Sequence, residues 1–257
     1  TSIVDVAETP LRPYSPNIPL NLVFGMMVGA FGGVFAAFGL EYLDDTLKTP
    51  DDVERYLRLA TLGTIPEIHI DDDADEGAKP ELEVIQRPTS PAAEAIRTLR
   101  ASLFLAAPGG LPTRLLMTSA RAGEGKTSIT VNLAIALAQI GRKVCVVDCD
   151  LRRPRLHKVM EQDSSPGVTN YLTGNASLEE VIRPTGYAGL DCVLAGPPAP
   201  NPVDLLNSGA LDELLKLLDA KYDHILVDAP PALGFADVPI ITSRLAGGCI
   251  IIAEAGS

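Results

Sequence analysis

The sequence predicts an α/β fold, in which helices flank a mostly parallel sheet, with a transmembrane helix ahead of that sheet. An almost wholly apolar run over residues 20–40 is long enough to cross a bilayer. Hydrophobic residues make up 46% of the chain and aromatic residues only 5%, so small aliphatic side chains form the core, as in parallel sheets covered by helices. The remaining chain contains four strand-like apolar runs, at 115–117, 143–148, 224–228 and 249–253.

The predicted transmembrane helix lies in a stretch without charged residues, from Pro13 to Leu40. At 1.5 Å per residue its apolar part spans roughly 30 Å, the thickness of the hydrocarbon layer. A cleaved signal peptide and a buried core helix are the alternatives. A signal peptide would carry basic residues ahead of the apolar run, whereas Asp5, Glu8 and Arg12 stand there.

Basic residues predict the orientation of this helix. Lys48, Arg55 and Arg58 follow it, against Arg12 alone before it. Because basic residues concentrate on the cytoplasmic side of membrane helices, the C-terminal side is placed in the cytoplasm.

Four segments result from this reading. They are a proline-rich periplasmic segment (1–19), the transmembrane helix (20–43), a cytoplasmic juxtamembrane segment with an acidic linker (44–88) and the α/β domain (89–257). The formal net charge of −12 argues against nucleic acid as a partner, since phosphate backbones are bound by Lys and Arg.

Two helices and a tether are predicted between the membrane and the sheet. Thr49 caps a helix that begins at Pro50 and whose apolar side extends to Ala60. Residues 71–76 contain five acids, which predicts a flexible tether, with a metal site as the alternative. A second helix begins at Ser90-Pro91 and runs to about residue 106.

The helix over 91–106 has an apolar face and, opposite it, a charged stripe formed by Glu94, Arg97 and Arg100. A solvated surface is the simplest interpretation of this stripe. The functional alternative is a subunit interface, at which the arginines meet carboxylates of a neighbouring copy.

A strand-like run, a glycine-bearing loop (119–128) and a helix-like run follow. This is the setting of a phosphate-binding loop, whose backbone N–H groups surround a polyphosphate. Lys126 would reach the outer phosphates and Thr127 would bind Mg²⁺. The first glycine of the usual motif is Ala120, and a surface turn is the alternative. The predicted nucleotide-binding residues are Ala122, Gly123, Glu124, Gly125, Lys126, Thr127 and Ser128.

Three carboxylates lie at the ends of strand-like runs. Asp148 ends the run over 143–148, Asp150 lies two residues beyond it, and Asp228 ends the run over 224–228. Ligands of parallel sheets bind at the carboxyl ends of the strands, so these acids are expected beside the phosphates. They could hold Mg²⁺ and orient or deprotonate an acceptor hydroxyl. Alternatively, the first two could cap the strand end and pair with the arginines at 152 and 153.

The four cysteines form no C-x-x-C pair and lie in or beside apolar runs. We therefore expect small buried residues rather than metal ligands or disulfides. They are Cys145, Cys149, Cys192 and Cys249.

This sequence resembles two known protein families. The order Glu41-Tyr-Leu-Asp-Asp45, then Leu62-Gly-Thr-Ile-Pro66, resembles the membrane exit of bacterial polysaccharide co-polymerases. The altered loop, Asp148-Cys-Asp150-Leu-Arg-Arg-Pro154, and Asp228-Ala-Pro-Pro231 followed by Asp237 resemble bacterial tyrosine kinases, which are P-loop NTPases. The pattern E-x-x-R-x-x-R at 94–100 resembles that family's oligomerisation motif.

The resemblance implies an inner-membrane tyrosine autokinase that uses ATP and Mg²⁺. Lys126, Asp148 and Asp150 would be catalytic, and Thr127, Asp148 and Asp228 would arrange the metal. The kinase domain would lie in the cytoplasm in a ring of copies, typically an octamer. Its further partners would be the polysaccharide export machinery and a protein-tyrosine phosphatase. A Min/Par-like ATPase switch and a non-catalytic scaffold are the alternatives.

The acceptor of the phosphoryl group is the point at which this chain departs from the family's pattern. The family phosphorylates a tyrosine cluster near its own C-terminus, whereas the six tyrosines of this chain are scattered. A doubly wound sheet would also continue past residue 253. We therefore expect the 257 residues to be part of a longer chain, with a naturally short regulatory protein as the alternative.

Overall fold

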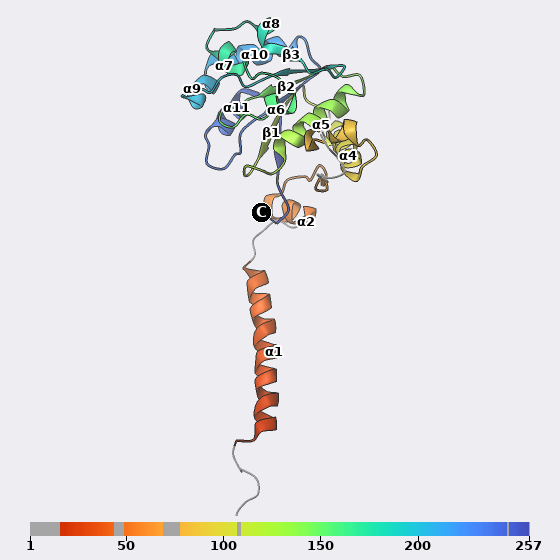
Figure 1. Ribbon diagram of the computed structural model, residues 1–257, viewed down its shortest axis with the longest axis vertical. Coiled ribbons are helices and arrows are strands. Elements are labelled where there is room, and N and C mark those ends of the chain that lie inside the picture. Colours follow the sequence, from red (N-terminus) through yellow and green to blue (C-terminus); the bar gives the residue numbers. More distant parts are fainter. Residues whose placement is uncertain (1–15, 44–48, 69–77, 107–108, 246, 257) are drawn as a thin grey trace, which may run out of the picture. The chain divides into compact units, whose positions relative to one another are not determined.

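The computed structural model describes residues 16–43, 49–68, 78–106, 109–245 and 247–256. The chain divides into two compact units, Thr1–Leu47 and Lys48–Ser257 (Figure 1). The predicted acidic tether at 71–76 lies outside the described residues. The first unit contains helix α1 (Ile18–Tyr42), and the second contains the sheet and the other helices.

Helix α1 has 25 residues, none of them buried. It is the one helix in the described ranges that is long and apolar enough to cross a membrane. Exposed apolar side chains all round the helix suit contact with lipid and do not suit a buried core helix.

The juxtamembrane segment forms a short helix, α2 (Pro50–Asp52), followed by a π-helical turn, η1 (Val53–Leu57). Thr49 caps its start, since its Oγ1 accepts from the backbone N of Asp52 at 3.4 Å and its own N donates to the Asp52 side chain at 2.9 Å. The expected extension to Ala60 is wrong, because Arg58 is in the left-handed region at φ 55° and ends the helix.

The second unit is built around a six-stranded sheet in the order β3-β4-β2-β5-β1-β6. Strand β3 is antiparallel to β4, and the other described pairs are parallel, so the predicted mostly parallel sheet is confirmed. The strands are β1 (Arg114–Ser119), β2 (Val144–Asp148), β3 (Ile182–Pro184), β4 (Leu190–Val193), β5 (His224–Asp228) and β6 (Gly248–Ile252). The helical elements are η2 (Pro80–Leu82), α3 (Glu83–Gln86), α4 (Pro91–Ala106), α5 (Lys126–Ala138), α6 (Leu156–Val159), α7 (Val168–Leu172), α8 (Leu178–Val181), α9 (Pro202–Leu206), α10 (Gly209–Asp219) and α11 (Asp237–Leu245).

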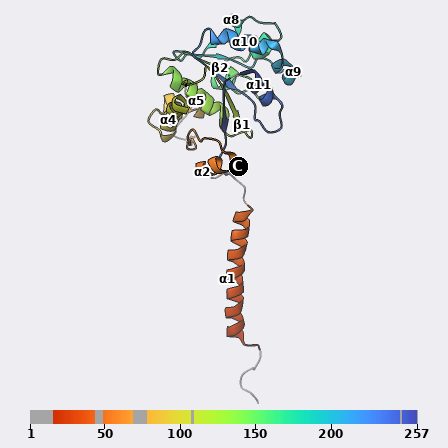
Figure 2. The same ribbon diagram turned by 180° about the vertical axis from the view of Figure 1, so that it is seen from behind.

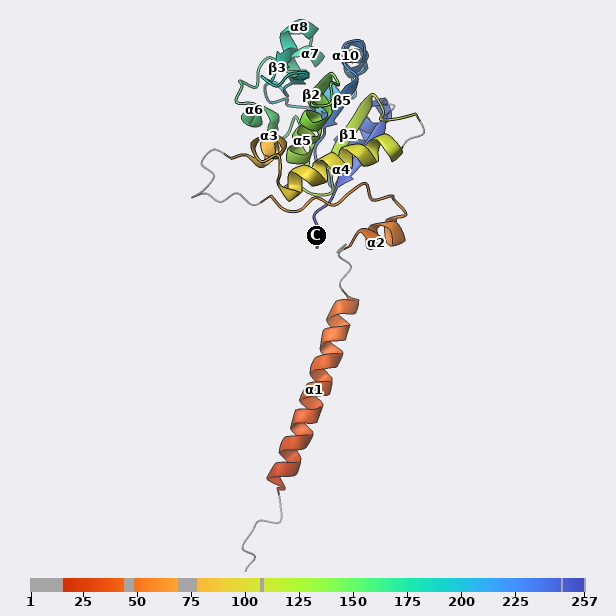
Figure 3. The ribbon, with the colours of Figure 1, turned by 90° about the vertical axis from the view of Figure 1, so that its right-hand side faces the viewer.

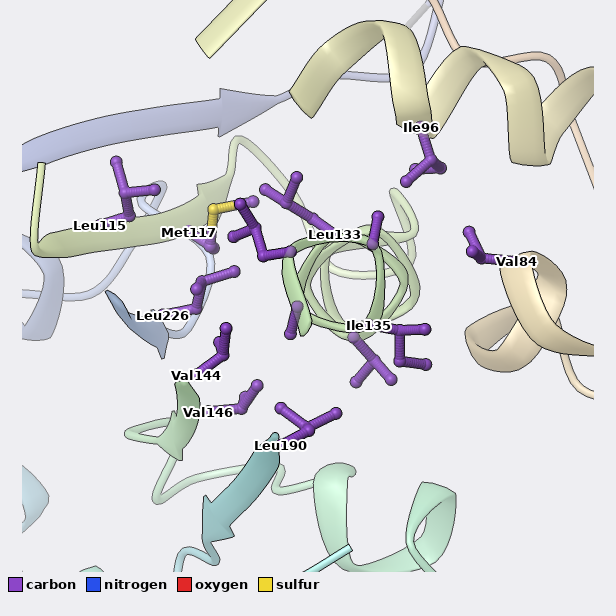
Figure 4. Packing of buried hydrophobic residues seen from close by; sticks show 14 of the residues in the cluster. Val84, Ile96, Leu115, Met117, Leu133, Ile135, Val144, Val146, Leu190 and Leu226 are labelled. Atoms are coloured by element: carbon purple, nitrogen blue, oxygen red, sulfur yellow. The ribbon is translucent and has the colours of Figure 1, made fainter. Parts of the chain in front are cut away.

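Helices cover both faces of the sheet and form two hydrophobic layers. One layer joins alternate strand residues to α4 and α5, which pack side by side (Figure 3). Figure 4 shows Leu133 and Ile135 of α5 between the sheet residues and Val84 and Ile96. The other layer joins the remaining strand residues to α7, α10 and α11 (Figures 1 and 2). This double covering explains the aliphatic composition.

Asn132 of α5 joins this helix to the segment that precedes α4. Its Oδ1 accepts from the backbone N of Val84 at 2.9 Å, and its Nδ2 donates to the backbone O of Pro80 at 2.7 Å. Asn132 is fully buried, so these bonds also satisfy its own polar atoms. The chain that enters the domain is therefore fixed to the helix that begins at the phosphate loop.

Helix α4 agrees closely with its prediction. Its start is capped by Ser90, whose Oγ accepts from the backbone N of Ala93 at 3.1 Å. Its buried side includes Ile96, Leu99 and Leu103. The 3.6-residue period of the sequence was therefore a sufficient guide to this helix.

The cysteine prediction is confirmed for Cys145, Cys149 and Cys192, which are buried free thiols. It is wrong for Cys249, which is exposed. Alternation along the outer strand β6 places Cys249 and Ile251 on its exposed side, while Ile250 lies on the buried side.

Candidate nucleotide site

The loop between β1 and α5 requires glycine because of its backbone conformation. Gly123 has φ 100° and Gly125 has φ 75°. A Cβ atom would meet nothing within 4 Å at either position, so the positive φ rather than lack of space selects glycine. Gly125 is also the N-cap of α5, whose first backbone N–H groups face the loop and favour an anion.

Side chains of the loop itself stabilise this shape. The carboxylate of Glu124 accepts from the backbone N of Arg121 at 2.7 Å, and the hydroxyl of Ser119 donates to the backbone O of Arg121 at 2.7 Å. The predicted nucleotide-binding residues Ala122 and Ser128 lie within the loop and at the first turn of α5. The loop is therefore shaped by its own hydrogen bonds.

Lys126 and Thr127 both contact Asp228. The Lys126 ammonium forms an ion pair with Oδ1, and the Thr127 hydroxyl donates to Oδ2 at 2.8 Å. All three residues are buried, with exposures of 8%, 7% and 1%. A lysine, a hydroxyl and a carboxylate predicted from separate motifs thus meet at one point.

The order of the strands explains this meeting. Strand β5 lies between β1 and β2, with Met117 beside Asp228 on one side and Asp148 beside Asp228 on the other. Parallel strands end at the same edge of the sheet, so the loop that follows β1 and the acids that follow β2 and β5 converge there.

Backbone N–H groups fix the side chains of Asp148 and Asp150. The Asp148 carboxylate accepts from the backbone N of Asp150 at 3.1 Å and of Leu156 at 3.3 Å. The Asp150 carboxylate accepts from the backbone N of Arg153 at 3.0 Å. These hydrogen bonds show that the two acids do cap the end of the strand, as one alternative predicted.

The site brings Asp148 and Asp228 together, and the charge that acts against their burial is that of Lys126. Burial raises the pKa of Asp148 well above its ordinary value, and the charge on Asp228 raises it further. Burial also raises the pKa of Asp228, against the opposing effect of Lys126. A further cation beside these two carboxylates would stabilise their charged forms.

The side chains present suit Mg²⁺. This ion prefers oxygen donors and is usually held by one or two carboxylates together with substrate phosphates and water. Thr127, Asp148 and Asp228 supply a hydroxyl and two carboxylates within one buried cluster. Across the described residues no group of three or more His, Cys, Asp or Glu side chains is arranged to hold a metal by itself. A site that shares its metal with a phosphate is consistent with both observations.

Arg152 does not pair with the acids beside it. Its guanidinium donates from Nε and Nη2 to the two carboxylate oxygens of Asp237, at 2.7 and 3.0 Å. It also lies over the ring of Phe235, 4.7 Å from the ring centre. Sequence reasoning found no role for Asp237 or Phe235. The signal that could have found this pair is an acid at the start of a helix after a strand-end motif.

The charged stripe on α4 lies away from this cluster. Arg97 pairs with Glu94 at 3.0 Å and donates to the backbone O of Pro88 at 2.7 Å. Arg100 donates to the backbone O of Ala136, near the end of α5, at 2.6 Å. The arginines thus have partners within their own chain, and an interface role for the stripe stays a prediction.

The phosphate loop, the buried lysine–carboxylate pair and the parallel sheet define a P-loop nucleotide-binding domain. The AAA domain family matches residues 114–253, which include all of these elements. The helical elements α1, α2, η1, η2, α3 and α4 lie ahead of the matched region.

Comparison with individual proteins shows to which family of P-loop proteins this chain belongs. The chain is 31% identical over 256 residues to the tyrosine-protein kinase ptk of Acinetobacter johnsonii, an alignment that covers 98% of this chain and 35% of that protein. It is 34% identical over 169 residues to the tyrosine-protein kinase YwqD of Bacillus subtilis, covering 66% and 71%. The solved kinase domain of the Escherichia coli tyrosine kinase ETK matches with a TM-score of 0.74 at 31% identity, over 81% of this chain and 82% of that one. The chain belongs to the bacterial tyrosine kinases.

The match is nevertheless partial in length. Several curated relatives, ptk among them, align with nearly the whole of this chain. The chain spans only about a third of the length of those relatives.

Proposed function

We propose that this chain carries the membrane anchor and kinase domain of a tyrosine autokinase. The kinase transfers the γ-phosphoryl group of ATP to tyrosines of neighbouring copies and regulates the polymerisation, export and chain length of a capsular or exopolysaccharide. The meeting of Lys126, Thr127 and Asp228 beside Asp148 carries this proposal. Membership of the family supports the reaction type.

Each residue of the site has its own role in the proposed phosphoryl transfer. The loop amides and the start of α5 bind the phosphates, and Lys126 offsets their charge. Thr127, Asp148 and Asp228 hold Mg²⁺, which when bound neutralises charge on the phosphate oxygens. Asp150 is slightly more accessible than Asp148, at 7% against 0% exposure, so it is the better placed to orient the acceptor phenol and take its proton. The phenol oxygen forms the new bond to phosphorus as the bond to ADP breaks.

The location and partners belong to the same proposal. Helix α1 crosses the inner membrane, and the basic residues after it keep the kinase domain in the cytoplasm, where ATP is available. The α4 stripe joins copies into a ring, typically an octamer. The export machinery and a protein-tyrosine phosphatase act on the same assembly.

Phosphotyrosine formation tests the assignment. The full chain, purified in detergent, is incubated with Mg-ATP and a Glu/Tyr copolymer as acceptor, beside Lys126→Met and the control Lys143→Met, which replaces an exposed lysine. We expect phosphotyrosine from the unmodified chain and the control, and at least about a tenfold lower rate from Lys126→Met.

The same assay separates the alternatives. Phosphate release without phosphotyrosine would identify an ATPase switch. Equal labelling by Lys126→Met would contradict the proposed site.

A further inference from the structure

The ion pair between Arg152 and Asp237 joins two loops at the edge of the nucleotide site. Both carboxylate oxygens of Asp237 are used, each by a different nitrogen of the guanidinium. Asp237 is fully buried, whereas the Arg152 side chain is about one-third exposed. Such a planar, two-bond pair fixes the orientation of both groups, which a single bond from lysine cannot do.

The Arg152 side of the pair belongs to the segment that shapes the catalytic acids. The backbone N–H groups of Asp150, Arg153 and Leu156 hold the carboxylates of Asp148 and Asp150. Arg152 lies between these donors in the chain. A shift of its backbone would therefore move the groups that orient both acids.

Asp237 is the first residue of α11 and ends the loop that follows Asp228. The backbone N of Ala232 in this loop donates to the O of Ser119 at 2.8 Å, and the N of Leu233 donates to the O of Ala120 at 3.2 Å. The loop after β5 is thus fixed to the start of the phosphate loop and, through Asp237, to the segment after β2.

We propose that Arg152 is a positioning residue for phosphoryl transfer, acting through Asp237. The pair holds the segment that orients Asp148 and Asp150 in register with Asp228 and the phosphate loop. This inference deepens the proposed function and rests on it. A small displacement of a catalytic group is enough to slow a reaction that depends on positioning.

The surroundings of Arg152 favour its charged form and hold its side chain in place. Hydrogen bonds to Asp237 and the nearby charge on Asp150 raise the pKa of Arg152, against the opposing effect of its partial burial. The ring of Phe235 covers one face of the guanidinium. The guanidinium is therefore held between its carboxylate partner and the ring.

The chain offers a matched control for the loss of such a pair. Arg114, at the opposite end of the sheet, makes a two-nitrogen pair with Asp219 and a further bond from its Nη1 to the backbone O of Leu245, the last residue of α11, at 3.4 Å. Arg114→Gln removes the same kind of interaction far from the nucleotide site. If Arg152→Gln has an effect that Arg114→Gln lacks, the effect comes from the position of the pair beside the nucleotide site. It does not come from a general loss of stability.

The first measurement is hydrogen–deuterium exchange of the full chain, which does not depend on catalysis. We expect faster exchange in the peptide over 149–156 for Arg152→Gln and Asp237→Asn, and an unchanged rate in that peptide for Arg114→Gln. Unchanged exchange in the two site variants would overturn the proposal. Thermal unfolding of each variant shows that it is folded, and Arg152→Lys serves as a milder change if Arg152→Gln is not.

The second measurement is the rate of phosphotyrosine formation as a function of ATP concentration. We expect kcat to fall about tenfold or more in Arg152→Gln and Asp237→Asn, with KM for ATP changed by less than about threefold, because the phosphate loop is intact. In the double variant the two losses should not multiply. Losses that multiply would mean that Arg152 acts independently of Asp237, which contradicts the proposal. An inactive unmodified chain would instead refute the proposed function, and the exchange experiment would still decide on the pair.

Discussion

At the scale of single residues, Asp228 is the point on which the site converges. It bonds Lys126 and Thr127 through different oxygens and lies beside Asp148 in the sheet. A buried carboxylate in this position needs positive charge nearby, and the lysine supplies it. The same arrangement draws the phosphate-binding groups toward the acids.

Gly125 provides a prediction at this scale. Gly125→Ala forces a side chain into the left-handed region, so we expect it to lower the free energy of unfolding by about 1 kcal/mol and to weaken nucleotide binding. Gly209→Ala is the matched control, because Gly209 begins α10 with free space around it and without a positive φ, and alanine favours helix. Urea unfolding and fluorescent-nucleotide titration measure both effects. Equal stability changes in the two variants would contradict the argument.

Contacts that follow from the order of the strands could be predicted from the sequence. Contacts that depend on the direction of a long side chain could not. Lys126, Thr127 and Asp228 could be placed together because parallel strands end at one edge. The partner of Arg152 was not predicted, because Asp237 lies 85 residues away in the chain. An acid at the start of a helix after a strand-end motif marks Asp237 as a candidate, but it does not show where an arginine side chain points.

At the scale of elements, local signals worked where burial supported them. Helix α4 follows its apolar period because that face packs against α5. The juxtamembrane helix has a good cap but ends at Leu57, where Tyr56 and Leu57 are 70% and 52% exposed. A cap starts a helix, but without a buried face little stabilises its further turns.

Strand β5 provides a pH prediction through His224. Burial lowers the pKa of this histidine, against the opposing hydrogen bond between its Nδ1 and the backbone O of Pro112. The unfolded chain therefore takes up a proton near pH 6.5 that the folded chain does not yet bind, so the free energy of unfolding falls as the pH drops through this range. We expect His224→Gln to reduce the slope of stability between pH 7.5 and 5.5 in urea unfolding. Equal slopes for the two proteins would show that another group is responsible.

At the scale of the whole molecule, the charged stripe of α4 provides the test of assembly. Arg97→Ala should convert the predicted ring to monomers, as measured by light scattering in detergent. Arg97 is the preferred position, because its bonds within its own chain go to Glu94 and Pro88 near the start of α4, whereas Arg100→Ala would remove a hydrogen bond to α5, the helix that begins at the phosphate loop. Lys216→Ala on α10 changes the same charge at another exposed helix position and should leave the mass unaltered. An unchanged mass for Arg97→Ala would assign the stripe to a solvated surface.

The position of β5 between β1 and β2 has a consequence for biosynthesis. The strands on either side of it emerge from the ribosome first, and Lys126 precedes Asp228 by 102 residues. At about 5–20 residues per second, the lysine is made about 5–20 s before the carboxylate that pairs with it. Until then β1 and β2 present unpaired edges, which are prone to aggregation. When β5 takes its place between β1 and β2, both of these edges are covered.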